Sequence, residues 1–228
     1  MRTVQSQFAL VWLAAMIVPS ASAADSLETV FARLDKAAAS FKSLTADIKR
    51  TTHTELVNAN ETDEGAIAVK KFKADDIRIL INFTQPEPKK IAIGGGKGQI
   101  FTPKANEVQV ADVRKHRDLV NAVLLLGFGA SSAELKAAYT ITFGGPETVN
   151  GVPALRIELI SKSEEIRRSI KKCELWIPDN GVTLQQKFHG SGGDYQVAIY
   201  SRIVVNPNLP DSAVRLDLPK GVKVNNLK

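Results

Sequence analysis

Most of the chain after Thr45 alternates apolar and polar residues in short runs, and no other feature constrains the fold as strongly. Residues 77–83 show the pattern, because every second one is isoleucine or phenylalanine. Turns rich in glycine or asparagine separate such runs, for example at residues 94–98 and 179–181. Short alternating strands joined by such turns are typical of an antiparallel meander. We expect about eleven strands, a number near the limit for an open twisted sheet.

Two helical segments accompany the predicted strands. The first follows Asp25 and Glu28, which have the spacing of a capping box, and its apolar residues recur every three or four positions over residues 27–44. The second covers residues 116–126. A short helix follows it, capped by Ser131 or Ser132 and ending at residue 138.

These elements predict a mainly β fold of the α+β kind. A sheet of about eleven twisted strands tends to curl, so we expect an unclosed antiparallel β-barrel. The N-terminal helix and the helical segment in the middle of the chain are the elements available to cover its concave apolar face, the latter as a lid. No shift in composition marks a linker, and residues 24–228 are expected to form a single domain.

The first 23 residues have the pattern of a secretory signal peptide. Residues 8–18 are an apolar run, Pro19 breaks it, and Ala21 and Ala23 supply the small side chains that a signal peptidase reads. The alternative, a transmembrane anchor, needs about 20 apolar residues. We therefore expect an exported, periplasmic protein that is a soluble monomer after cleavage.

The sequence offers little material for catalysis or for a bound metal or cofactor. Cys173 is the only cysteine, and the three histidines lie on separate predicted elements. The glycines at residues 94–98 resemble a phosphate loop, but no serine or threonine follows Lys97. We expect a protein that is not an enzyme and that has no cofactor and no metal.

Basic residues gather at strand ends, at residues 70–73, 89–90 and 167–172, and the net charge is +6. No aromatic residues interleave with them in the manner of a nucleic-acid site, and nucleic acid is a poor partner for an exported protein. A solvated face is one interpretation. Attraction to an acidic protein surface or to anionic lipid head groups is the other.

The apolar positions predict a wall that binds acyl chains. Alternation places Ile79, Ile81 and Phe83 on one face of one strand, and an outward apolar face would be a hazard for an exported protein. Each buried methylene contributes about 0.8 kcal/mol, so an acyl chain would bind firmly. Because these positions carry no charge, we expect recognition to depend on chain length and hardly on the head group. The complete predicted wall is Ile79, Ile81, Phe83, Ile93, Phe101, Ile141, Ile157 and Trp176.

Leu124, Leu125 and Phe128 are predicted to cover this wall as a movable lid. They offer more apolar surface than one helix face uses, and Gly127 and Gly129 flank the phenylalanine as possible hinges. The alternative is a plain core helix with no role in binding.

Several landmarks, in this order, resemble the periplasmic outer-membrane lipoprotein carrier family, the LolA-like proteins. They are the segments 65–71, 79–83, 84–86, 95–101 and 218–224, of which the third reads Thr-Gln-Pro. The resemblance implies an unclosed antiparallel barrel under a helical lid, with no enzymatic activity. It also implies three partners: acylated lipoproteins, an inner-membrane ABC transporter that releases them, and an outer-membrane receptor.

One departure from the family concerns the latch of the lid. Lys71 stands where the family has an arginine that ties the lid shut, and Arg78 is the nearest arginine. Lysine cannot make the same bidentate bonds. Two further hypotheses therefore stay open: a carrier of another lipid, and a sensor that binds lipids or lipoproteins and signals by protein contact.

Overall fold

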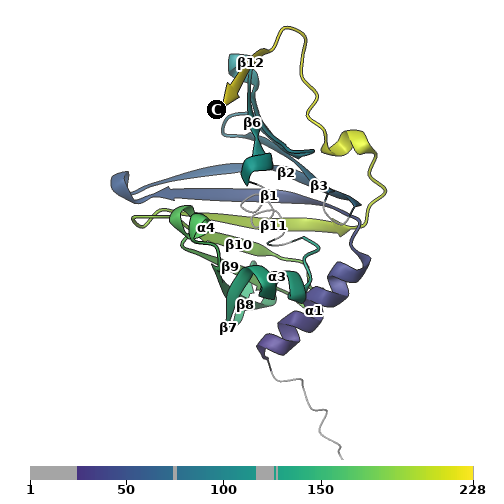
Figure 1. The fold of residues 1–228 in the computed structure, drawn as a ribbon, viewed down its shortest axis with the longest axis vertical. Helices are drawn as coiled ribbons and strands as arrows, with labels where there is room; N and C mark the ends of the chain where they lie inside the picture. The colour runs from purple at the N-terminus through teal and green to yellow at the C-terminus, as the bar shows by residue number, and fades with distance from the viewer. Residues whose placement is uncertain (1–24, 74–75, 117–125, 127, 228) are drawn as a thin grey trace, which may run out of the picture.

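The computed structural model describes residues 25–73, 76–116, 126 and 128–227. Within these residues, twelve strands form one sheet in the order β12-β6-β5-β4-β3-β2-β1-β11-β10-β9-β8-β7 (Figure 1). Their bounds are β1 Ser43–Thr54, β2 Ala59–Lys73, β3 Asp76–Gln85, β4 Lys89–Gly94, β5 Lys97–Thr102, β6 Glu107–Asp112, β7 Tyr139–Val149, β8 Val152–Ser161, β9 Lys172–Ile177, β10 Gln185–His189, β11 Tyr195–Val205 and β12 Lys223–Leu227.

The sheet is open, because β7 and β12 are its two edges and do not pair with each other. Figure 1 shows how strongly it twists, since β6 and β12 run nearly upright where β1 and β11 run across the view. All pairs are antiparallel except β12 with β6, which is parallel. The predicted mainly β, unclosed antiparallel architecture is thus confirmed.

Three α-helices lie among the described residues: α1 Leu27–Ser40, α3 Ser132–Ala138 and α4 Glu164–Ser169. The cap of α1 is Ser26, whose hydroxyl accepts a hydrogen bond from the Thr29 amide, rather than the predicted Asp25. Ser131 caps α3 in a complete capping box with Glu134, as one of the two predicted alternatives. The predicted helix at 116–126 falls almost entirely outside the described residues.

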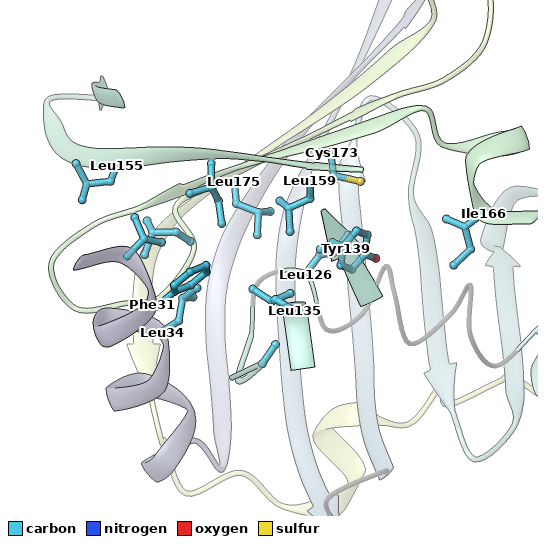
Figure 2. Close-up of a cluster of buried hydrophobic side chains, with 14 residues drawn as sticks. Phe31, Leu34, Leu126, Leu135, Tyr139, Leu155, Leu159, Ile166, Cys173 and Leu175 are labelled. Atoms are coloured by element: carbon cyan, nitrogen blue, oxygen red, sulfur yellow. The ribbon is translucent and has the colours of Figure 1, made fainter. Parts of the chain in front are cut away.

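The helices define an inner face of the sheet, the face on which α1 packs. Val30, Phe31 and Leu34 of α1 are buried against alternate residues of β8 and β9. Figure 2 shows this cluster, in which Leu155, Leu159 and Leu175 project from their strands toward the side of α1 and of Leu135. The opposite surface of the sheet is called the outer face below.

A second buried cluster continues the inner face over β1, β2, β3 and β11. Phe41, which follows α1, and Phe128 both belong to it. Gly129 lets the backbone approach the Phe41 ring closely, because it has φ +82° and a Cβ atom there would lie 2.5 Å from Cδ1 of Phe41.

The C-terminal segment crosses the outer face before it ends as β12. Before that strand, the segment forms a 3-10 turn, η4 Asp211–Val214, against β2 and β3. Lys70 holds it there, donating from Nζ to the Leu209 carbonyl at 2.6 Å and to Asp211 at 2.8 Å. Val214 is buried, so its apolar side chain serves this tertiary contact.

Candidate apolar binding face

Isoleucines from three neighbouring strands meet on the inner face. Ile79 lies opposite Ile93, and Ile81 opposite Ile91, which in turn lies opposite Ile100 of β5. Residues paired directly across a sheet share a face. Ile79 and Phe83 are buried, Ile81, Ile91 and Ile93 are half-buried, and Ile100 is 37% exposed. These strands therefore present apolar surface that the protein itself does not fully cover.

Two more predicted wall residues lie on the inner face, in the other half of the sheet. Ile157 is opposite Leu175 and is completely buried, and Ile141 is opposite Leu159 and half-buried. Both belong to the cluster beneath α1 and α3. Ile157 is therefore part of the packed core, whereas Ile81, Ile91, Ile93 and Ile100 in the other half of the sheet stay partly accessible.

Phe101 and Trp176 differ from the prediction, because they lie on the outer face. Phe101 pairs with Lys90 and so has the opposite parity from Ile91. Trp176 pairs with Arg156, and its indole Nε1 donates to Glu147 at 2.7 Å. Both rings are buried, so they contribute to packing on the outer side of the sheet.

Residues 126 and 128 lie against the inner face. Phe128 is 3% exposed and meets the Tyr200 ring edge-on, with 5.0 Å between the centroids. Gln186 donates from Nε2 to the Leu126 carbonyl at 2.9 Å, and Tyr200 donates from its hydroxyl to Oε1 of Gln186 at 3.1 Å. A buried polar chain therefore holds this segment. Leu124 and Leu125 lie outside the described residues.

The two residues considered for a latch lie on different faces. Lys71 is opposite Ile77 on the inner face, and its backbone amide donates to the Lys42 carbonyl at 2.8 Å. Arg78 pairs with Lys70 on the outer face, where it binds Asp76 through two hydrogen bonds and lies 4.2 Å from the Phe72 ring. Sequence reasoning missed Gln186, which binds the Leu126 carbonyl, and Tyr200, which binds Gln186 in turn.

Charged side chains border the apolar wall, although the wall positions predicted from the sequence carry no charge. Arg50 and Asp63 face each other on β1 and β2 and form an ion pair on the inner face. The Arg50 guanidinium lies 4.3 Å from the centroid of Phe83. The alternation of β1 could have revealed Arg50, because it continues the parity of Leu44, Ala46 and Ile48.

A pocket of about 340 Å³ opens farther along the same face, between the ends of β1, β10 and β11 and the residue after α4. Thr52, Phe188 and Gln196 line it from the inner face, and Ile170 lines it from the side of α4. His53 stands at its edge, stacked on Tyr195 with 4.7 Å between the rings. Hydrogen bonds to Asn60 and Glu55 raise the pKa of His53.

Several titratable groups of the described residues are engaged in structural contacts. Burial raises the pKa of the Cys173 thiol to about 12, so it carries no thiolate at neutral pH. On the outer face, Glu174 accepts hydrogen bonds from Arg156, Lys172 and His189. Burial by itself raises the pKa of Glu174, but the hydrogen bonds and the charge of Lys172 outweigh it, and the pKa is lowered. Within the described part of the chain, no group of three or more potential ligands could hold a metal ion.

Comparisons with known proteins show the fold and nothing finer. No family model matches the chain, and neither does any curated protein. MucB matches in structure with a TM-score of 0.50 and 13% identity, over 83% of this chain and 62% of MucB. An uncharacterized conserved protein from Thermus thermophilus matches with a TM-score of 0.51 and 12% identity, over 88% of this chain and 98% of its own.

The matched structures also include a LolA superfamily protein from Nitrosomonas europaea, with a TM-score of 0.40 and 14% identity, over 85% of this chain and 99% of its own. The chain spans about three fifths of the length of MucB. The fold is LolA-like, as the sequence landmarks implied, and at these identities the likeness is one of fold. No helix in the described residues is long and apolar enough to cross a bilayer.

Proposed function

We propose that this protein is a periplasmic carrier that shields the acyl chains of lipoproteins on its inner face. The observation that carries the proposal is the half-buried row Ile81, Ile91 and Ile93, with the exposed Ile100 beside it. A contiguous apolar surface on an exported protein marks a binding site, because it is unfavourable when it faces only water. Binding of this kind needs no catalytic group.

The carrier receives acylated lipoproteins from an inner-membrane ABC transporter and delivers them to an outer-membrane receptor. Support for this route comes from the sequence landmarks and from the LolA-like fold. The hydrogen bonds of Gln186 and Tyr200 support the idea that the segment near Leu126 and Phe128 covers the wall. These bonds hold the Leu126 carbonyl against the sheet and can be broken reversibly. Release would then require the separation of a few weak contacts.

Mass spectrometry of lipids and lipoproteins that copurify with the protein from the periplasm tests this function directly. Acylated proteins should copurify with the unmodified chain, and their complete absence would contradict the carrier. A lipid without attached protein would favour the carrier of another lipid. A stable complex with a membrane-bound signalling protein would favour the sensor.

A substitution on the wall links the cargo to the site. Ile81→Trp should weaken binding of a fluorescent acyl probe about tenfold, because the indole displaces roughly two methylenes worth about 0.8 kcal/mol each. Ile160→Trp is the control, since Ile160 is 45% exposed on the outer face. Equal affinities in both variants, with the fold intact, would mean that the wall lies elsewhere.

A further inference from the structure

The apolar part of the inner face ends at a row of charged side chains. Moving along β1 to β4, one row holds Leu44, Val69, Ile79 and Ile93, and the next holds Ala46, Ile67, Ile81 and Ile91. The following row brings Phe83 opposite Lys89, and the pair Arg50 and Asp63 comes directly after it. From Ile79 to Phe83 the wall is about 13 Å long, at about 3.3 Å per residue. An extended apolar chain on this wall therefore has one end beside the charges.

The charged row carries more positive than negative charge. The Asp63 carboxylate accepts from Arg50, through Nε at 3.2 Å and through Nη2, and the Lys89 ammonium lies 3.5 Å from the same oxygen atom. Two cations thus share one carboxylate. The Asp63 side chain is 7% exposed and that of Arg50 is 16% exposed, so water compensates the surplus charge poorly. Glu61, the next acidic residue on this face, is exposed and lies opposite Thr52.

Lys89 has hydrogen-bonding capacity to spare within the described part of the chain. Its ammonium has three donor hydrogens, and its one neighbouring carboxylate oxygen is farther away than an ordinary hydrogen bond. The ammonium also lies 5.7 Å from the centroid of Phe83, and its side chain is 29% exposed. It is therefore placed to meet an anion at the rim of the apolar wall.

We propose that Arg50 and Lys89 bind the anionic head group, a carboxylate or a phosphate, of an amphiphile whose chain lies along the isoleucines. This inference rests on the acyl-binding wall of the proposed carrier function, and it specifies the ligand for the alternative in which the carried lipid has no attached protein. Asp63 positions the guanidinium of Arg50, and Phe83, which lies opposite Lys89, is the last apolar side chain of β3 before the Arg50–Asp63 pair. A ligand with a neutral head leaves the surplus charge without a partner, so acidic amphiphiles bind more tightly.

The test compares probes of equal chain length with the full-length mature protein. The ratio of the affinities for a fluorescent fatty acid and for its methyl ester measures how much the head-group charge contributes to binding. A monoalkyl phosphate that competes with them distinguishes phosphate from carboxylate. The acid should bind about tenfold more tightly than the ester, and added salt should reduce this preference. A charged hydrogen bond of ordinary strength gives a ratio of this size.

Two matched lysine variants test whether Lys89 causes the preference for the acid over the ester. Lys89→Met should remove most of the preference for the acid and leave ester affinity within about twofold, because it keeps an apolar stem of similar length. Lys90→Met is the control, since Lys90 lies on the outer face opposite Phe101. It should change neither affinity.

The outcomes separate this inference from the carrier function. If the ester binds and Ile81→Trp weakens it, but the acid is no tighter, the head-group site is refuted and the carrier stands. A loss of acid and ester binding in equal measure in Lys89→Met would also refute the head-group site. If neither probe binds the unmodified protein, both proposals fail.

Discussion

Removing the hydroxyl of Tyr200 should loosen the contacts of Leu126 and of residues 128–130 with the sheet. In Tyr200→Phe the carbonyl oxygen of Gln186 loses its donor, and both side chains are about 5% exposed or less. A buried polar atom left without its partner costs about 1–3 kcal/mol. In a domain of this size each kcal/mol corresponds to about 2–4 °C in melting temperature, so we expect a fall of roughly 2–12 °C.

Thermal unfolding and amide hydrogen exchange together measure this effect. Residues 128–130 should exchange faster in Tyr200→Phe than in the unmodified protein, because Gln186 no longer holds the Leu126 carbonyl as firmly. Tyr195→Phe is the control, since Tyr195 is half-buried and none of the described hydrogen bonds involves its hydroxyl. The double variant with Gln186→Leu should lose less than the sum of the two single changes, because it removes both polar partners. A melting temperature within about 1 °C of the unmodified protein, with unchanged exchange, would refute the reasoning.

Two further changes test the packing and the electrostatics. Gly129→Ala should destabilise the fold by more than about 1 kcal/mol, because it combines a positive φ with a clash against Phe41, and urea unfolding measures the loss. Gly145→Ala shares the positive φ but meets nothing within 4 Å, so equal losses in the two variants would contradict the clash. Glu174 has a lowered pKa when folded, so its stabilisation is present above the unfolded value of about 4.3 and is lost as the pH falls through the folded value. Glu174→Gln should therefore be less stable at pH 7 and lose less stability between pH 5 and pH 3, and parallel profiles of the two proteins would argue against this account.

The sequence predicts the parity of side chains within a strand better than the parity between strands. Ile79, Ile81 and Phe83 share a face because they alternate within β3. The face of Phe101 depends on the turn between β4 and β5, where Gly94 pairs with Lys97. A turn with one residue more or fewer reverses every side chain of the next strand. If Gly95 and Gly96 are taken as a two-residue turn, counting back along both strands places Phe101 opposite Lys90, as the structure shows.

Trp176 shows a different limit of sequence reasoning. Residues 175–177 are all apolar and all buried, so hydrophobicity does not show which face each occupies. The polar residues Lys172 and Glu174 have the parity of Trp176, and they mark the outer face. The hydrogen bonds of Gln186 and Tyr200 were beyond prediction, because they join the hairpin of β10 and β11 to residue 126, which lies far away in the sequence. They form only when β10 and β11 meet residue 126.

The place of β1 between β2 and β11 has a consequence for how the chain folds. β2 follows β1 directly, but β11 lies far along the sequence, and the Asn206 carboxamide that accepts from the Lys42 amide is 164 residues away from it. Pairings of such long range slow folding, because the loop must close before its contacts stabilise it. The meander from β1 to β6 can form early, whereas the seam between β1 and β11 must wait for nearly the whole polypeptide. Until that seam closes, β1 has an unpaired edge, and the nascent chain is then most prone to misassociation.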